Sequence, residues 1–145
     1  MPVLIPDYYI PDLDVRLGLY RRLSGLHSKV ELEGFAADLI DRFGKLPKEV
    51  NTLLLIVRIK EMCKRAGIAQ LDGGPKGATV RFHNDKFASP AGLVEFIQAQ
   101  NGLAKVRDNK IVVRRDWAKE SDKIKGAFAI ARDLAVIAAP KKVKS

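Results

Sequence analysis

The sequence predicts an α+β fold: a helix-rich single domain with a small, mainly antiparallel sheet of two hairpins. Three observations predict it. Apolar residues recur at helical spacing before residue 67, two alternating apolar runs with turn residues follow between residues 68 and 113, and a long amphipathic stretch closes the chain. The strand-helix alternation of a doubly wound nucleotide-binding fold is missing.

Length and composition fit one globular domain. The chain has 145 residues, of which 47% are hydrophobic and 30% charged, enough for a real core. We expect residues 1–139 to form the domain and residues 140–145 to be a basic flexible tail. No run of about 18 uninterrupted apolar residues is present, and the N-terminus lacks the basic and apolar run of a signal peptide. These features predict a soluble, cytoplasmic protein without a membrane partner.

The first segment, residues 3–12, alternates apolar side chains with prolines, which prevent a helix and keep their predecessors extended. We expect a strand edge or a strap that lines the core. Asp12 or Asp14 can then cap a helix that ends near Ser24. Its apolar positions follow helical steps and are Leu13, Val15, Leu17, Leu19, Tyr20, Leu23 and Leu26.

Two more helices are expected next. Residues 29–43 carry the most regular apolar stripe of the chain, and Gly44 supplies a C-terminal stop. The stripe consists of Leu32, Phe35, Ala36, Leu39, Ile40 and Phe43. Pro47 then opens a third helix that is apolar on nearly all sides. We therefore expect this third helix to be the buried centre of the fold.

The second half predicts the sheet. Residues 68–82 alternate around a glycine-rich turn and predict a hairpin, and the Asp108-Asn109 pair predicts another between residues 106 and 113. An amphipathic helix is expected over residues 90–100. A final helix over residues 119–138 has a stripe of small apolar residues suited to close packing.

Sites for catalysis, metals and cofactors are not expected in this chain. The loop 72–77 contains glycines and Lys76, but a phosphate-binding loop would need a following helix that begins with Lys and then Ser or Thr. No nucleophile motif is present, and Asp12 and Asp14 are better explained as helix caps. Cys63 is the only cysteine, so it is expected to be buried filler, without a disulfide or a Cys/His metal site.

The charge of the chain keeps a nucleic-acid function open. Its 26 Lys and Arg residues exceed its 17 Asp and Glu residues, which gives a net charge of +9. This balance favours acidic partners, whether nucleic acid, anionic lipid or an acidic protein face. The basic residues are spread over every segment and form no recognised binding motif. A basic nucleic-acid-binding module is thus an alternative that net charge alone supports.

The second helix carries a different kind of candidate surface. By helical spacing we assign Glu31, Gly34, Asp38, Asp41 and Arg42 to the side opposite the apolar stripe. Such a strip is either an ordinary solvated helix face or a docking surface for an arginine-bearing partner, which carboxylates can bind through bidentate hydrogen bonds. The pattern by itself leaves both interpretations open.

Long ordered motifs connect the chain to a known family. They are Leu4-Ile5-Pro6-Asp7-Tyr8-Tyr9-Ile10-Pro11-Asp12, Arg16-Leu17, Tyr20, Glu31-Leu32 and Leu39-Ile40-Asp41-Arg42-Phe43-Gly44-Lys45-Leu46-Pro47. With these motifs the chain resembles the C-terminal (TRCF) domain of the bacterial transcription-repair coupling factor family, also called Mfd. The resemblance is strongest over residues 4–72, and we carry over no functional residue beyond residue 100.

The resemblance implies a fragment of a longer protein whose motor lies upstream. In this family the full protein is an ATP-dependent translocase on double-stranded DNA, with ATP and Mg²⁺ in the motor and no cofactor in this domain. It displaces stalled RNA polymerase and recruits nucleotide excision repair. The implied role of the domain is autoinhibition: it docks on an excinuclease-B-like module and masks the surface that binds excinuclease A. The resemblance places the interface carboxylates at Asp38 and Asp41, with Arg42 and Glu31 as further candidates.

Overall fold

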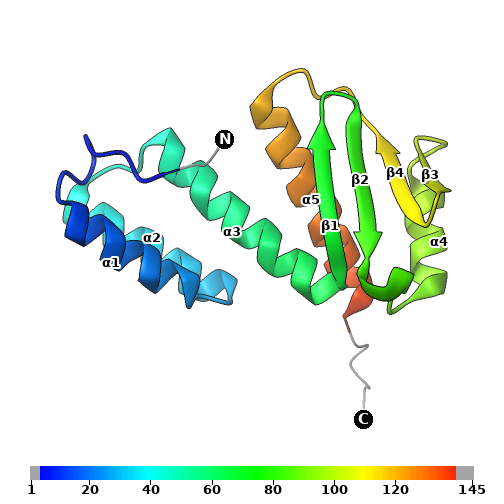
Figure 1. Ribbon diagram of the computed structural model, residues 1–145, viewed down its shortest axis with the longest axis horizontal. Helices are drawn as coiled ribbons and strands as arrows, with labels where there is room; N and C mark the ends of the chain where they lie inside the picture. The colour runs from blue at the N-terminus through cyan, green and yellow to red at the C-terminus, as the bar shows by residue number, and fades with distance from the viewer. Residues whose placement is uncertain (1–3, 140–145) are drawn as a thin grey trace, which may run out of the picture. The chain divides into compact units, whose positions relative to one another are not determined.

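The computed structural model describes residues 4–139 (Figure 1), so the tail expected at 140–145 lies outside the described residues. Its elements, in chain order, are α1 (Leu13–Ser24), α2 (Lys29–Phe43), α3 (Lys48–Ala66), β1 (Ile68–Gly74), β2 (Gly77–Phe82), the short 3-10 helix η1 (His83–Asp85), α4 (Pro90–Ala99), β3 (Ala104–Arg107), β4 (Lys110–Arg114) and α5 (Glu120–Ala138). The predicted α+β class with two antiparallel hairpins is confirmed. The chain separates into two compact units, residues 1–58 and 59–145.

The first segment is a lining strap and contains no strand within its described residues, 4–12. Ile5 and Ile10 are 3% and 1% exposed and belong to the core of residues 1–58. The Tyr9 hydroxyl donates to the carbonyl oxygen of Gly44 at 2.7 Å and lies 3.2 Å from that of Leu39. Because Gly44 directly follows the last turn of α2, the Tyr9 hydroxyl attaches the strap to the C-terminal end of that helix.

The ends of α1 and α2 follow from their caps. Asp12 caps α1 by accepting a hydrogen bond from the Val15 amide at 3.1 Å, and Gly44 ends α2 with φ of 90°, a conformation that favours glycine. The side chains of Leu13 and Leu17 are exposed, although their helical spacing assigned them to the apolar face. The strap and α2 bury only the side of α1 that carries Leu19 and Leu23.

The prediction that the third helix is the buried centre is wrong. In α3 the buried side chains are Val50, Met62 and Ala66, and its other apolar side chains are half-buried. The N-terminal part of α3 contributes to the core of residues 1–58, whereas Cys63 and Ala66 contribute to the core of residues 59–145. A helix that serves two cores needs apolar residues on several sides, which explains the pattern without deep burial.

The sheet of residues 59–145 has the strand order β1-β2-β4-β3, with every neighbouring pair antiparallel. Two-residue turns close both hairpins, Pro75-Lys76 and Asp108-Asn109, the latter with φ of 52° and 62°. Helices α4 and α5 cover one face (Figure 1), where Val80, Val113 and Leu134 share a core. The fold class and both hairpins therefore match the predictions from the sequence. The pairing of β2 with β4 joins the two hairpins into one sheet.

Three further observations concern thiol reactivity, metal binding and membrane-spanning helices. Burial raises the pKa of the Cys63 thiol, which disfavours a reactive thiolate. Residues 4–139 contain no group of three or more His, Cys, Asp or Glu side chains placed to hold a metal ion. Over the same residues, each helix is too short or too polar to cross a membrane.

Candidate protein-interaction surface

Helix α2 divides its residues among a buried side, two flanks and an outward face. The buried side holds Leu32, Phe35 and Leu39. Residues at 3.6-residue spacing on the opposite side define the outward face, and all are exposed: Val30, Gly34, Ala37 and Asp41. Of the five residues that the sequence placed on this side, only Gly34 and Asp41 lie there. The prediction is wrong for Glu31, Asp38 and Arg42, which occupy the flank.

Asp38 is compensated by arginines of its own chain. Its Oδ2 lies 2.7 Å from a guanidinium nitrogen of Arg22 in α1 and 3.8 Å from one of Arg42. The same guanidinium groups stack on aromatic rings, Arg22 over Phe35 at 5.1 Å and Arg42 over Phe43 at 4.8 Å. The Asp38–Arg22 ion pair thus links α2 to α1, whereas Arg42 pairs with Asp38 within α2. A partner arginine would have to compete with Arg22 for the carboxylate.

Glu31 works at the N-terminus of its own helix. Ser28 is the N-cap and accepts from the Glu31 amide at 3.1 Å, while the Glu31 carboxylate accepts from the His27 amide at 3.2 Å. This reciprocal arrangement is a capping box with the carboxylate reaching one residue further back. The Ser-x-x-Glu spacing was visible in the sequence and indicates the structural role of Glu31.

Asp41 is the open carboxylate of the predicted set. It is exposed, and within residues 4–139 it has no ion-pair or hydrogen-bond partner for its side chain. Its neighbours on the outward face are small or apolar: Gly34 has open space where a Cβ would stand, and Val30 is 76% exposed. A partner can therefore approach the α2 backbone closely and meet a negative charge at one end.

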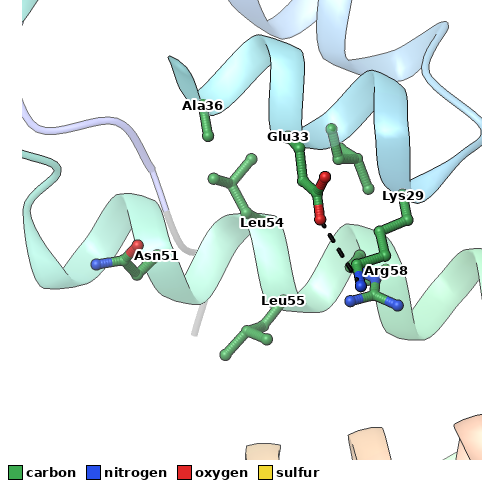
Figure 2. Close-up of a pocket in the computed structure, with 8 residues that line it drawn as sticks. Lys29, Glu33, Ala36, Asn51, Leu54, Leu55 and Arg58 are labelled. Atoms are coloured by element: carbon green, nitrogen blue, oxygen red, sulfur yellow. Dashed lines mark ion pairs between the residues drawn. The ribbon is translucent and has the colours of Figure 1, made fainter. Parts of the chain in front are cut away.

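A groove beside this face was not predicted from the sequence. It lies between α2 and α3 within residues 1–58 and has a volume of about 370 Å³ (Figure 2). Leu32, Ala36, Leu54 and Leu55 form its apolar lining, and Lys29, Glu33, Asn51 and Arg58 are polar lining residues. Lys29 and Glu33 form an ion pair of 3.7 Å across one helical turn. The apolar residues on nearly all sides of α3 are the sequence signal that could have indicated this groove.

Comparison with known proteins reveals a consistent set of relatives. The family model described as TRCF domain matches residues 1–93. Transcription-repair-coupling factors of Rickettsia conorii and Escherichia coli are each 40% identical to the chain, over 77% and 69% of its length. The Myxococcus xanthus protein is 30% identical over 97% of the chain. These matches cover 10%, 9% and 12% of the relatives, so the chain spans about a tenth of their length.

A solved structure has the same fold. The crystal structure of the C-terminal domain of a transcription-repair coupling factor superimposes with a TM-score of 0.73. The superposition covers 95% of this chain and 89% of that chain, at 18% sequence identity. At this identity the likeness establishes the fold, and the family assignment rests on the sequence matches.

Proposed function

The chain belongs to the TRCF domain family, and we propose that it is the autoinhibitory protein-interaction domain of a longer transcription-repair coupling factor. The longer protein is proposed to be a cytoplasmic ATP-dependent translocase on double-stranded DNA that displaces stalled RNA polymerase and recruits nucleotide excision repair. ATP and Mg²⁺ then belong to its motor, and this domain acts by binding alone. The open carboxylate of Asp41 on the outward face of α2 is the observation that carries the proposal.

The proposed partner is the excinuclease-B-like module of the same protein. Docking of α2 on that module masks the surface that binds excinuclease A. Asp41 supplies a carboxylate for a partner arginine, which can bind it through two parallel hydrogen bonds. Gly34 and Ala37 permit close backbone approach, and Val30 adds apolar contact area. These properties support a small interface with one specific charge contact.

The other candidate residues act on the shape of the surface. Asp38 fixes α2 against α1 through Arg22, Arg42 supports Asp38 from within α2, and Glu31 fixes the first turn of α2. Their side chains are already engaged, so their substitution changes docking mainly through the position of α2. This division of roles separates Asp41, as a contact residue, from Asp38, as a positioning residue.

Docking between parts of one chain needs only modest intrinsic affinity. A covalent connection gives the two modules a high effective concentration, so a small polar interface can stay closed. A ligand opens such an interface only to the extent that it binds the open form more tightly. RNA polymerase or DNA engaged by the longer protein would supply that difference and release the surface for excinuclease A.

Binding in trans tests the contact directly. Titration of the excinuclease-B-like module with this domain should give at least about tenfold weaker binding for Asp41→Arg, because two like charges then meet. Glu95→Arg is the matched control, since Glu95 is an exposed carboxylate in α4. Equal affinity of the wild type and Asp41→Arg would refute the site assignment. Melting curves should be unchanged, because Asp41 has no partner within the described residues.

Deletion of the domain tests its regulatory role. In the longer protein, removal of this domain should raise translocation or the binding of excinuclease A. Asp41→Arg in the intact protein should have the same effect to a smaller degree. If neither activity rises in the deletion variant, the domain has a passive structural role.

A further inference from the structure

The sheet of residues 59–145 has one face that its helices do not cover. Side chains alternate between the two faces along each strand, and Val80, Ile111 and Val113 point into the core beneath α4 and α5. Their neighbours in sequence point to the opposite side. Thr79 and Val112, which pair across β2 and β4, are half-buried at the centre of that second face.

This second face is strongly basic. Every exposed charged side chain that β2, β3 and β4 direct to it is cationic, and we call this set the basic sheet face: Arg81, Lys105, Arg107, Lys110 and Arg114. Strand β1 adds one carboxylate, Asp72, which accepts a hydrogen bond from the side-chain Nε2 of Gln70 at 2.7 Å. Asp108 lies in the β3–β4 turn. The face therefore keeps a large excess of positive charge.

The cations of the basic sheet face are next to one another. Arg107 and Lys110 are directly paired across β3 and β4, and Arg81 follows the Val80 and Ile111 pair toward the same end of the sheet. Like charges placed opposite each other destabilise a sheet. Within residues 4–139 none of the five side chains has a carboxylate partner at ion-pair distance. The arrangement is unfavourable for the isolated domain, which indicates a role in binding.

Protection of a sheet edge does not account for this face. Edge strands often carry Lys and Arg to prevent pairing with other chains, and β3 is an edge strand with Lys105 and Arg107. Arg81 and Arg114, however, lie on the interior strands β2 and β4, which have no free edge. The positive charge on these interior strands therefore has a reason other than edge protection.

The positive surface continues past the end of β4. A depression of about 490 Å³ is lined by Arg114, Lys76 and Arg115, together with Pro75, Leu103 and Asp116. The Arg115 guanidinium is held by the Gln100 side-chain oxygen and by the Arg114 carbonyl. Lys76 lies in the β1–β2 turn beside it. This depression extends the basic sheet face and offers further cations to an extended polyanion.

We propose that the basic sheet face binds the phosphate backbone of a double-stranded nucleic acid without reading its sequence. Nucleic-acid interfaces are polar and strongly positive, whereas protein interfaces have an apolar centre depleted in Lys. Here the centre offers only Thr79 and Val112. No aromatic side chain lies on the face among the described strands, so base stacking, which single strands use, is absent. The proposal is independent of docking by α2.

A salt titration of the full 145-residue chain tests the proposal. Affinity for a duplex DNA of mixed sequence is measured by fluorescence anisotropy, for the wild type and for Arg81→Gln/Lys110→Gln/Arg114→Gln. The control Arg21→Gln/Lys45→Gln/Lys48→Gln removes the same charge from exposed positions in residues 1–58. A second control changes Lys141, Lys142 and Lys144 to Gln.

The face variant should bind roughly tenfold more weakly or worse at about 50 mM salt. The plot of log affinity against log salt concentration should become shallower, with its slope smaller in magnitude by about 2.7, because each lost phosphate contact removes about 0.9. Both control variants should lose much less affinity, and two duplexes of different sequence should bind the wild type with the same affinity. Equal losses in the face variant and a control would overturn the proposal in favour of diffuse attraction. Tighter binding to polyglutamate of matched charge would overturn it in favour of an acidic protein.

Discussion

The two compact units of this chain differ most in how they use charge. Residues 1–58 contain eight basic and eight acidic residues, whereas residues 59–145 contain 18 basic and nine acidic residues, so the entire net charge of +9 belongs to the second unit. In the first unit, carboxylates such as Asp38 and Glu31 are engaged by neighbouring groups. The proposed docking by the neutral helical unit would therefore depend on a few specific contacts, and the proposed binding by the cationic sheet on its collective field.

The largest expected effects test whether the two compact units also unfold independently of each other. Leu39 and Leu134 are both 0% exposed, one in each unit, so Leu→Ala at either position should cost about 2–5 kcal/mol of unfolding free energy. Amide hydrogen exchange should show the loss mainly in α2 for Leu39→Ala and mainly in β2 for Leu134→Ala. Equal loss of protection in both units after either substitution would show that the two units unfold together.

Gly→Ala substitutions should change the stability of the chain in opposite directions in the two units. In α5 a Cβ on Gly126 would overlap the Trp117 ring, so Gly126→Ala should destabilise the chain by about 1–3 kcal/mol. In α2, apart from the chain neighbours of Gly34 and the backbone of its own helix, no atom of residues 4–139 lies within 4 Å of where a Cβ on Gly34 would stand. Gly34→Ala should therefore stabilise the chain by about 0.5–1 kcal/mol through helix propensity. Chemical denaturation measures both changes.

Gly34→Ala also sharpens the docking proposal. If the outward face of α2 meets its partner closely, the added methyl group should weaken binding in trans while the domain becomes more stable. Binding as tight as that of the wild type would mean that close approach at Gly34 is not needed.

A smaller effect separates the two aspartates of α2. Asp38→Asn removes an ion pair of two partly exposed side chains and should cost no more than about 1 kcal/mol. Asp41→Asn should leave the melting temperature unchanged, because Asp41 has no side-chain partner within residues 4–139. A stability loss at Asp41 as large as that at Asp38 would contradict the assignment of Asp38 as the positioning residue.

The smallest expected effect concerns the strap and its pH dependence. The Tyr8 hydroxyl donates to the Glu49 carboxylate at 2.7 Å, and this hydrogen bond lowers the pKa of Glu49 below 4.5 and raises the pKa of Tyr8 above 10.0. The Glu49 contribution is present above pH 4.5 and is lost as pH falls through the lowered pKa. The Tyr8 contribution is present below pH 10.0 and is lost as pH rises through the raised pKa.

Tyr8→Phe should therefore lower the melting temperature slightly at neutral pH and leave it nearly unchanged at both extremes. The contact is exposed to solvent, so the difference is small. A constant difference between Tyr8→Phe and the wild type from about pH 3 to about pH 11 would show that the hydroxyl contributes through something other than this hydrogen bond.

Local chemistry made much of the fold predictable. The Asp12 cap, the Gly44 stop and the Asp108-Asn109 turn act over a few residues, so their consequences are readable from the chain. The site was less predictable. The partner of Asp38 is Arg22, which is 16 residues away, and nothing in the spacing of α2 indicates that α1 would present a guanidinium there.

The sequence by itself determined the class of the fold and the positions of its elements, because caps, turns and apolar periodicity are properties of neighbouring residues. Its ordered motifs also indicated the family of the chain. Only the tertiary structure decided which charges remain open. The pairing of β2 with β4 placed Arg81 on one face with Lys110 and Arg114, which belong to a different strand, and the packing of α1 beside α2 compensated Asp38 while leaving Asp41 exposed. Electrostatic interactions depend on distance in space, which spacing along the chain does not contain.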